Sequence, residues 1–221
     1  MKLLIKFPTR NRPAKFLKIL KLYHSLLDDK TTKFIVSCDN DDETMNNDGI
    51  KEYVSELTEI NIELCYNDNK SKIEAVNNDI DGIDFDIVLL ASDDMVPVIN
   101  GFDTIIKNKM IESYPDTDGV LWFNDGYQGN KLNTLSILGK KYYDRFNYIY
   151  NPEYKSVWCD NEFMDVANIL NKQTYFDEII IRHEHPDWGF GKNDFTHEEN
   201  MKNESSDRTV YNERKSINFG L

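Results

Sequence analysis

Two adjacent carboxylates, Asp93 and Asp94, follow a short apolar run, and carboxylates in this position could bind a metal ion. The run, residues 87–91, is continuous and bounded by polar residues, which is typical of a buried strand in a parallel sheet. Ligands of open α/β sheets bind just beyond the carboxyl ends of the strands. Two hard oxygen ligands there suit Mg²⁺ or Mn²⁺, which complete their shells with water and phosphate. A solvated Asp-Asp turn is the alternative, because Asp is a common turn residue.

A second candidate site is the basic loop Pro8–Pro13, which reads Pro-Thr-Arg-Asn-Arg-Pro and follows an apolar stretch. Pro13 fits the first turn of a helix, with Asn11 or Arg12 at the cap position. A helix N-terminus flanked by Arg10 and Arg12 is a natural site for a pyrophosphate. Two arginines on a solvated loop are the equally open alternative.

Asp39 ends the next apolar run, residues 33–38. A carboxylate after the second strand of such a sheet can accept hydrogen bonds from a ribose or a base. The acidic loop that follows lacks the glycine and the terminal Glu of a calcium-binding EF-hand loop, so we discount a calcium site there.

Later in the chain, Asp160 lies at the start of a predicted helix, and His183 and His185 follow the last predicted strand. Asp160 is either a plain N-cap or a carboxylate held in a cleft as a general base. The two histidines alternate, so on a strand they share a face, where they are either structural or metal ligands.

The elements that must position these residues alternate between strands and helices, which predicts an α/β fold with a mostly parallel, doubly wound central sheet and right-handed crossovers. We expect one Rossmann-like domain, with a nucleotide-binding half at residues 1–97, an acceptor half at 98–195 and a helical tail at 196–221. The predicted strands are residues 2–7, 33–38, 62–66, 87–91, 119–123, 134–138 and 179–182.

Composition excludes several function classes. The net charge of −13 disfavours a broad nucleic-acid or anionic-membrane surface but not a nucleotide, since a divalent ion can supply positive charge locally. Neither G-x-G-x-x-G nor G-x-x-x-x-G-K-[ST] occurs, which argues against a dinucleotide oxidoreductase and a P-loop enzyme. The cysteines, Cys38, Cys65 and Cys159, are odd in number and far apart, so we expect reduced thiols and no zinc site. With no signal-peptide core and no apolar span of membrane length, the sequence predicts a cytoplasmic protein.

The order of these features resembles the nucleotide-diphospho-sugar transferases with the A-type glycosyltransferase fold, particularly the large family 2. The resemblance covers roughly residues 1–190. It rests on Pro8–Pro13, Asp39, the helix start near Lys72, Ser92–Pro97, Trp158–Phe163 and His183–Pro186.

The resemblance implies a role for each matching residue. It assigns nucleotide binding to Pro8, Thr9, Arg10, Arg12, Asp39, Lys72 and Ser92. It assigns Mn²⁺ or Mg²⁺ binding to Asp93, Asp94, His183 and His185. It makes Asp160 the base that deprotonates the acceptor, with Glu162 as the alternative.

The implied function is a metal-dependent, inverting glycosyltransferase that moves a sugar from a nucleotide-diphosphate donor to a glycan, a lipid-linked sugar or a protein side chain. One departure weakens the metal assignment, because Ala91 stands where the family's D-x-D motif has its first Asp. That departure keeps open a non-catalytic nucleotide- or glycan-binding protein. A sugar nucleotidyltransferase is a further alternative, although it would need a glycine-rich, lysine-bearing loop, and residues 8–13 contain no glycine.

Overall fold

The computed structural model describes residues 1–184, 189 and 195–221. Among the described residues, no helix combines the length and hydrophobicity needed to cross a bilayer. The three cysteines are free thiols, as the sequence predicts. His185 lies outside the described residues.

A seven-stranded sheet forms the centre of the molecule, in the order β3-β2-β1-β4-β7-β6-β8. The first four strands of this order are parallel, and β6 and β8 are parallel to each other, so the predicted mostly parallel sheet is confirmed. The strands are β1 (Leu3–Pro8), β2 (Lys33–Asp39), β3 (Ile62–Asn67), β4 (Ile87–Leu90), β6 (Val120–Phe123), β7 (Ile137–Gly139) and β8 (Gln173–Phe176).

Strand β7 departs from the predicted pattern, because it runs antiparallel to both β4 and β6. A parallel return needs a crossover, usually a helix, whereas β6 and β7 are joined by a loop without one. The chain therefore reverses at this loop and enters the sheet between β4 and β6. Strand β8 was not predicted at all.

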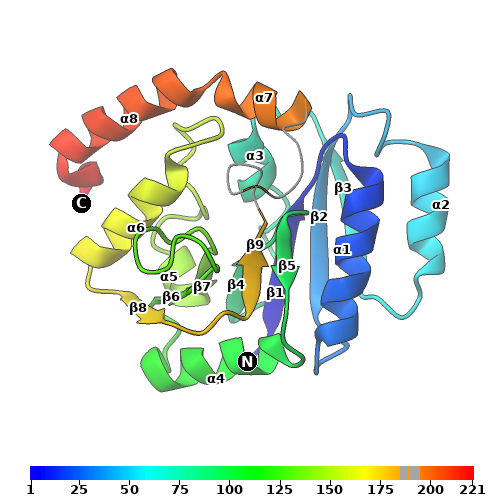
Figure 1. Ribbon diagram of the computed structural model, residues 1–221, viewed down its shortest axis with the longest axis horizontal. Coiled ribbons are helices and arrows are strands. Elements are labelled where there is room, and N and C mark those ends of the chain that lie inside the picture. Colours follow the sequence, from blue (N-terminus) through cyan, green and yellow to red (C-terminus); the bar gives the residue numbers. More distant parts are fainter. Residues whose placement is uncertain (185–188, 190–194) are drawn as a thin grey trace.

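Helices cover both faces of the sheet, as the alternation along β1 requires (Figure 1). Leu3, Ile5 and Phe7 face α1 and α4, whereas Leu4 packs in a second apolar cluster with α3, α5 and α6. The helices are α1 (Pro13–Leu26), α2 (Asp48–Glu56), α3 (Lys72–Asn77), α4 (Phe102–Ser113), α5 (Lys140–Tyr143), α6 (Cys159–Ile169), α7 (Phe195–Met201) and α8 (Glu204–Ser216), and a 3₁₀ turn follows at Asn218–Gly220.

Two further features shape the rim of the sheet. Strands β5 (Met95–Pro97) and β9 (Ile181–His183) form an antiparallel ribbon, separate from the central sheet, in which Met95 pairs with His183. The predicted strand at residues 179–182 thus pairs with β5 rather than joining the central sheet. The C-terminal helices α7 and α8, orange and red in Figure 1, run along one edge of the molecule.

Candidate active site

A cleft of about 1230 Å³ opens at the carboxyl ends of β1, β2 and β4. Strand β1 has β2 on one side and β4 on the other, so the strand order reverses here, which is where open α/β sheets bind ligands. Most of the predicted site residues line this cleft, although their sources are spread over more than 170 positions. They are Pro8, Thr9, Arg10, Arg12, Asp39, Lys72, Ser92, Asp93, Asp94, Asp160 and His183.

Arg10 and Asp39 form a fixed pair at one end of the cleft. The Arg10 Nη1 donates to Asp39 Oδ2 at 2.6 Å, and the Asn69 amide donates to Asp39 Oδ1 at 2.7 Å. Arg10 also binds both carboxylate oxygens of Asp41, and these hydrogen bonds, helped by Asp39, raise the pKa of Arg10. The guanidinium is therefore a permanent positive charge whose orientation two carboxylates fix.

Asp93 joins the basic loop to the end of β4. Its side chain is only 7% exposed, and Arg12 Nη1 lies 3.0 Å from its Oδ1, with the Lys15 ammonium 4.0 Å away. Burial raises the pKa of Asp93, and the charge of Arg12 opposes that rise. Asp93 is thus engaged with cations of the chain itself.

Asp94 has a different environment, although it is the next residue. Its Oδ1 accepts from the Ser92 hydroxyl, and its Oδ2 lies 3.7 Å from His183 Nε2. Burial alone would raise the pKa of Asp94, but the hydrogen bond and charge of His183, together with Ser92, hold it well below the usual range. The pairing of β5 with β9 brings these two residues together, because Asp94 precedes β5 and His183 ends β9.

Few of the described side chains in the cleft are placed to hold a divalent ion. Among the described residues, no group of three His, Cys, Asp or Glu is placed to hold a metal. Ala91 is fully buried in the apolar core, and Asp93 is paired with Arg12. Asp94 and His183 do fit, since 3.7 Å is less than twice the metal–ligand distance of about 2.0–2.1 Å. Two protein ligands suffice for an ion that completes its shell with water and phosphate.

Asp160 lines the cleft from the start of α6, outside the central sheet. It is the second residue of α6, whose N-cap is Trp158, so the plain N-cap interpretation of Asp160 is wrong. Burial raises the pKa of Asp160, while the positive charge of Lys72 opposes the rise. A carboxylate whose pKa is raised toward neutrality is a stronger general base than a fully solvated one.

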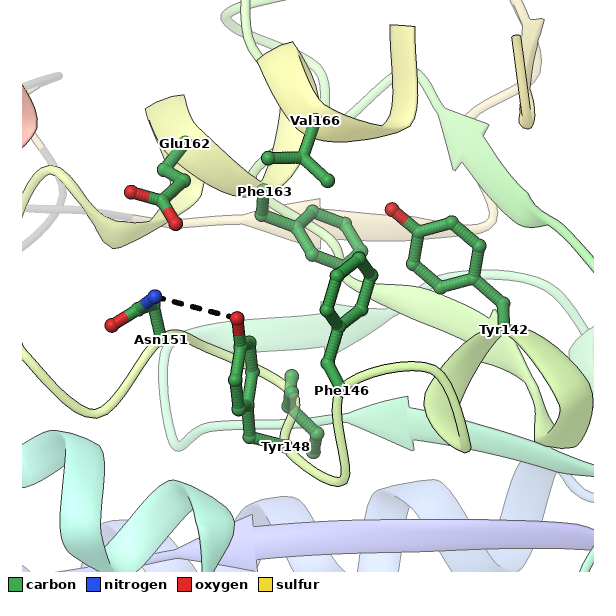
Figure 2. Close-up of a pocket in the computed structure, with 8 residues that line it drawn as sticks. Tyr142, Phe146, Tyr148, Asn151, Glu162, Phe163 and Val166 are labelled. Carbon is green, nitrogen blue, oxygen red and sulfur yellow. Dashed lines mark hydrogen bonds between the residues drawn. The ribbon is translucent and has the colours of Figure 1, made fainter. Parts of the chain in front are cut away.

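Glu162 does not line the cleft, contrary to the expectation that it could replace Asp160. Residues two apart on a helix do not face the same side. Its carboxylate instead accepts from Arg214 Nε and Nη2 at 2.8 and 3.0 Å and from the Tyr154 hydroxyl at 2.8 Å. Figure 2 shows it on α6, at a small cavity of about 20 Å³ that it shares with Tyr148, Asn151 and several apolar side chains.

The loop between β6 and β7 contributes Thr134 to the cleft. Asp125, which is 2% exposed, links the two ends of this loop. It accepts hydrogen bonds from the Thr134 hydroxyl at 2.7 Å and from the backbone N–H groups of Tyr127 and Gln128. The Asp125 carbonyl also accepts from the His183 backbone N–H at 3.0 Å. A loop that the sequence marks only as polar thus supports a candidate metal ligand.

Several lining residues escaped the sequence analysis. Some have a local signal that could have been used, since Lys15 lies in the first turn after Pro13 and Lys70 and Ser71 flank the start of α3. Others come from the polar C-terminal tail and carry no motif that points to a ligand. These are Glu199, Asn200 and Asn203.

Comparisons place this architecture among known structures. No protein-family model and no curated protein matches the sequence. Solved structures do match, and the mannosyltransferase PcManGT from Pyrobaculum calidifontis, in complex with GDP-Man and Mn²⁺, gives a TM-score of 0.68 at 10% identity, over 86% of this chain and 58% of that one. S. aureus TarS gives 0.64 at 15% identity, over 82% and 36%.

The S. aureus TarS fragment 1–349 in complex with UDP-GlcNAc gives a TM-score of 0.61 at 15% identity, over 82% of this chain and 58% of that one. The chain has the fold of these proteins. The A-type glycosyltransferase fold expected from the sequence is therefore confirmed. The chain spans only 36–58% of the length of these structures.

Proposed function

We propose that this protein is a glycosyltransferase that moves a sugar from a nucleotide-diphosphate donor to an acceptor hydroxyl, with inversion at the anomeric carbon. One observation carries the proposal. Three features line a single cleft of the A-type fold: the Arg10–Asp39 ion pair, the Asp94–His183 pair, and Asp160, a carboxylate whose pKa is raised.

The charge of the cleft supports a divalent ion as part of the donor site. Six Lys and Arg and eight Asp and Glu occur among its described lining residues, an excess of two negative charges. A nucleoside diphosphate adds further negative charge, so an unassisted cleft would repel it. Mn²⁺ or Mg²⁺ held by Asp94 and His183 would, when bound, supply Lewis-acid stabilisation of the leaving diphosphate.

The residues of the chain would supply the remaining chemistry. Asp160 accepts the acceptor's proton while the new bond to the sugar forms and the bond to the diphosphate breaks, a contribution of roughly 10²–10⁴-fold. Arg10 and Lys72 add fixed positive charge where the leaving group becomes more negative. Lys72 also favours the ionised form of Asp160, and so prepares the base.

The acceptor side of the cleft is aromatic. Tyr150, Tyr154 and Trp158 line it, and Trp158 is only partly buried. Tyr150 and Tyr154 are almost fully buried, so the Trp158 ring is the one of the three that can stack on a sugar. A glycan, a lipid-linked sugar and a protein side chain all remain candidate acceptors, and a cytoplasmic location remains part of the proposal.

A thermal-shift panel of nucleoside diphosphates and nucleotide sugars, with and without Mn²⁺, tests the donor site. A ligand at a hundred times its dissociation constant stabilises the fold by about 2.7 kcal/mol, which for a chain of this size raises Tm by roughly 5–11 °C. The best donor is then assayed for sugar transfer and hydrolysis with wild type and Asp160→Asn. Equal turnover by the two proteins would overturn the assignment of the base.

Ala91 favours a second candidate, a nucleotide- or glycan-binding protein without turnover. Its small side chain stands where a metal-binding carboxylate is expected, and it is fully buried. Nucleotide stabilisation that is equal with and without Mn²⁺, combined with no turnover of any donor, would select this alternative over the enzyme.

A further inference from the structure

A carboxylate from α8 holds the cleft-lining segment that precedes Asp160. Asp207 is 1% exposed. Its Oδ1 accepts from the Lys155 backbone N–H at 3.1 Å, and its Oδ2 accepts from those of Ser156 and Val157 at 2.9 and 3.0 Å. The segment 155–157 belongs to no helix or strand, so these bonds replace the ladder that regular structure would supply.

Arg214 holds the chain on the other side of Asp160. Its guanidinium donates to both oxygens of Glu162, at 2.8 and 3.0 Å, and also binds Glu153. The Arg214 side chain is only 14% exposed, and a bidentate arginine–carboxylate pair has a fixed geometry. Glu162 lies one-half turn after Asp160 on α6, so the pair sets the rotation of that helix.

The same face of α8 also contacts the bend at which α6 begins. Asp207, Tyr211 and Arg214 are spaced four and three residues apart, so they share one face of the helix. The Tyr211 ring lies 5.2 Å from that of Trp158, and its hydroxyl donates to Asp165 at 2.7 Å. Trp158 has a φ of +63°, a conformation that a bulky residue keeps only when its surroundings enforce it.

We propose that this face of α8, formed by Asp207, Tyr211 and Arg214, is a clamp that fixes where the Asp160 carboxylate stands in the cleft. The inference rests on the proposed role of Asp160 as the base. Asp160 itself accepts a local hydrogen bond from the Asn161 backbone N–H, so its position follows the first turn of α6. Asp207 and Arg214 are thus positioning residues that act through Asp160.

The change Asp207→Asn loosens the clamp with little change in shape. The amide presents one acceptor oxygen and an NH₂ group to three backbone donors, so at least one donor loses its partner. Proton transfer depends steeply on distance, and a displacement of about 1 Å can cost roughly 10²-fold in rate. We therefore expect Asp207→Asn to lower kcat roughly 10- to 100-fold while the calorimetric Kd of the nucleoside diphosphate changes less than about twofold.

Asp103→Asn is the matched control. Asp103 is fully buried on α4, outside the cleft, and accepts from the backbone N–H groups of Asp28 and Asp29 at 2.9 and 3.1 Å. Both variants remove the same kind of bond, so both lower the urea midpoint, but only Asp207→Asn should lower kcat. Equal kcat for the two variants would overturn the clamp.

A double mutant separates positioning from a general loss of structure. In an Asp160→Asn background, adding Asp207→Asn should produce no further loss of kcat, because the residue through which it acts is already disabled. A full additional loss would contradict the inference. Arg214→Lys, which keeps the charge but cannot bind both oxygens of Glu162, should repeat the pattern and serves if Asp207→Asn does not fold.

Hydrogen exchange gives a measurement that needs no turnover. Backbone amides at residues 155–162 should exchange faster in Asp207→Asn than in wild type, with no change there in Asp103→Asn. Unchanged exchange would overturn the clamp even if no donor is ever turned over. If exchange rises as expected but wild type transfers no sugar, the proposed function fails and the clamp remains.

Discussion

The two walls of the cleft are held in place by different means. On the donor wall, Arg10, Asp39 and Asp93 stand at the ends of parallel strands, where Arg10 pairs with Asp39 and Asp93 pairs with Arg12. On the acceptor wall, Asp160 and Thr134 lie outside the sheet, and remote carboxylates, Asp207 and Asp125, hold their surroundings, mainly by accepting backbone N–H groups. A rigid sheet edge therefore places the charges of the proposed donor site, whereas buried acids hold the surroundings of the proposed base and of Thr134.

This contrast predicts that acceptor-wall mutations change the rate and donor-wall mutations change the affinity. The largest effect should come from Asp160→Asn, which removes the proposed base without altering the donor wall. We expect kcat to fall by roughly 10²–10⁴-fold, with the Kd for the nucleoside diphosphate unchanged by calorimetry. A comparable loss of nucleotide affinity would show that the walls are not separate.

The next largest effect should come from removing the candidate metal ligands. With Asp94→Asn or His183→Ala, the extra thermal stabilisation expected from Mn²⁺ in the nucleotide complex should largely disappear, because in the proposed site both side chains would hold the same ion. The measurement is Tm with nucleotide, with and without Mn²⁺. Asp93→Asn is the control, since its carboxylate is paired with Arg12. A greater loss in the control would instead make Asp93 the metal residue.

Mutations on the donor wall should change the affinity for the nucleotide. Arg10→Ala removes a charge that Asp39 and Asp41 hold in place, and a hydrogen bond to a charged group contributes about 1.5–3 kcal/mol when shielded from water. Because the Arg10 side chain is 39% exposed, we expect the lower end, roughly tenfold in nucleotide Kd. The kcat at saturating donor should stay near that of wild type, which steady-state kinetics can check.

The pH dependence of sugar transfer should report on Asp160, on the acceptor wall. Burial raises the pKa of Asp160, with Lys72 opposing, and only the ionised carboxylate can accept a proton. Transfer should therefore fall as the pH drops through a value above that of an ordinary Asp. The pH dependence of kcat/KM measures this limb. The residual activity of Asp160→Asn should not show this fall at acidic pH.

The smallest effect should follow from Asp125→Asn, in the loop that supports Thr134 and His183. One oxygen of Asp125 accepts from the backbone N–H groups of Tyr127, Gln128 and Gly129, and the other accepts from the Thr134 hydroxyl. In Asp125→Asn the amide oxygen can keep the backbone donors and the NH₂ group can donate to the hydroxyl, so the change replaces charged hydrogen bonds by neutral ones. The expected cost is about 1 kcal/mol of unfolding free energy, measured by urea denaturation. Because Asp125 supports the acceptor wall and does not itself line the cleft, nucleotide Kd should not change.

The same division explains what the sequence could predict. The donor wall follows local rules, since apolar runs predicted β1, β2 and β4, and Asp39 and Asp93 follow from where those runs end. The antiparallel direction of β7 and the pairing of β5 with β9 depend on contacts far along the chain. Glu162 faces Arg214 because of a partner 52 residues away, and nothing in the polar stretch around Asp207 signals that it binds three backbone amides.

The position of α8 in the chain also orders the assembly of the site during synthesis. Asp160 leaves the ribosome 54 residues before Arg214, which corresponds to roughly 3–11 s at ordinary elongation rates. In that interval the strands that precede Arg10, Asp39 and Asp93 are complete, but α8, which holds the acceptor wall through Asp207 and Arg214, has not yet been synthesised. Ribosome-bound chains stalled just after residue 200 has emerged should therefore retain nucleotide yet transfer no sugar.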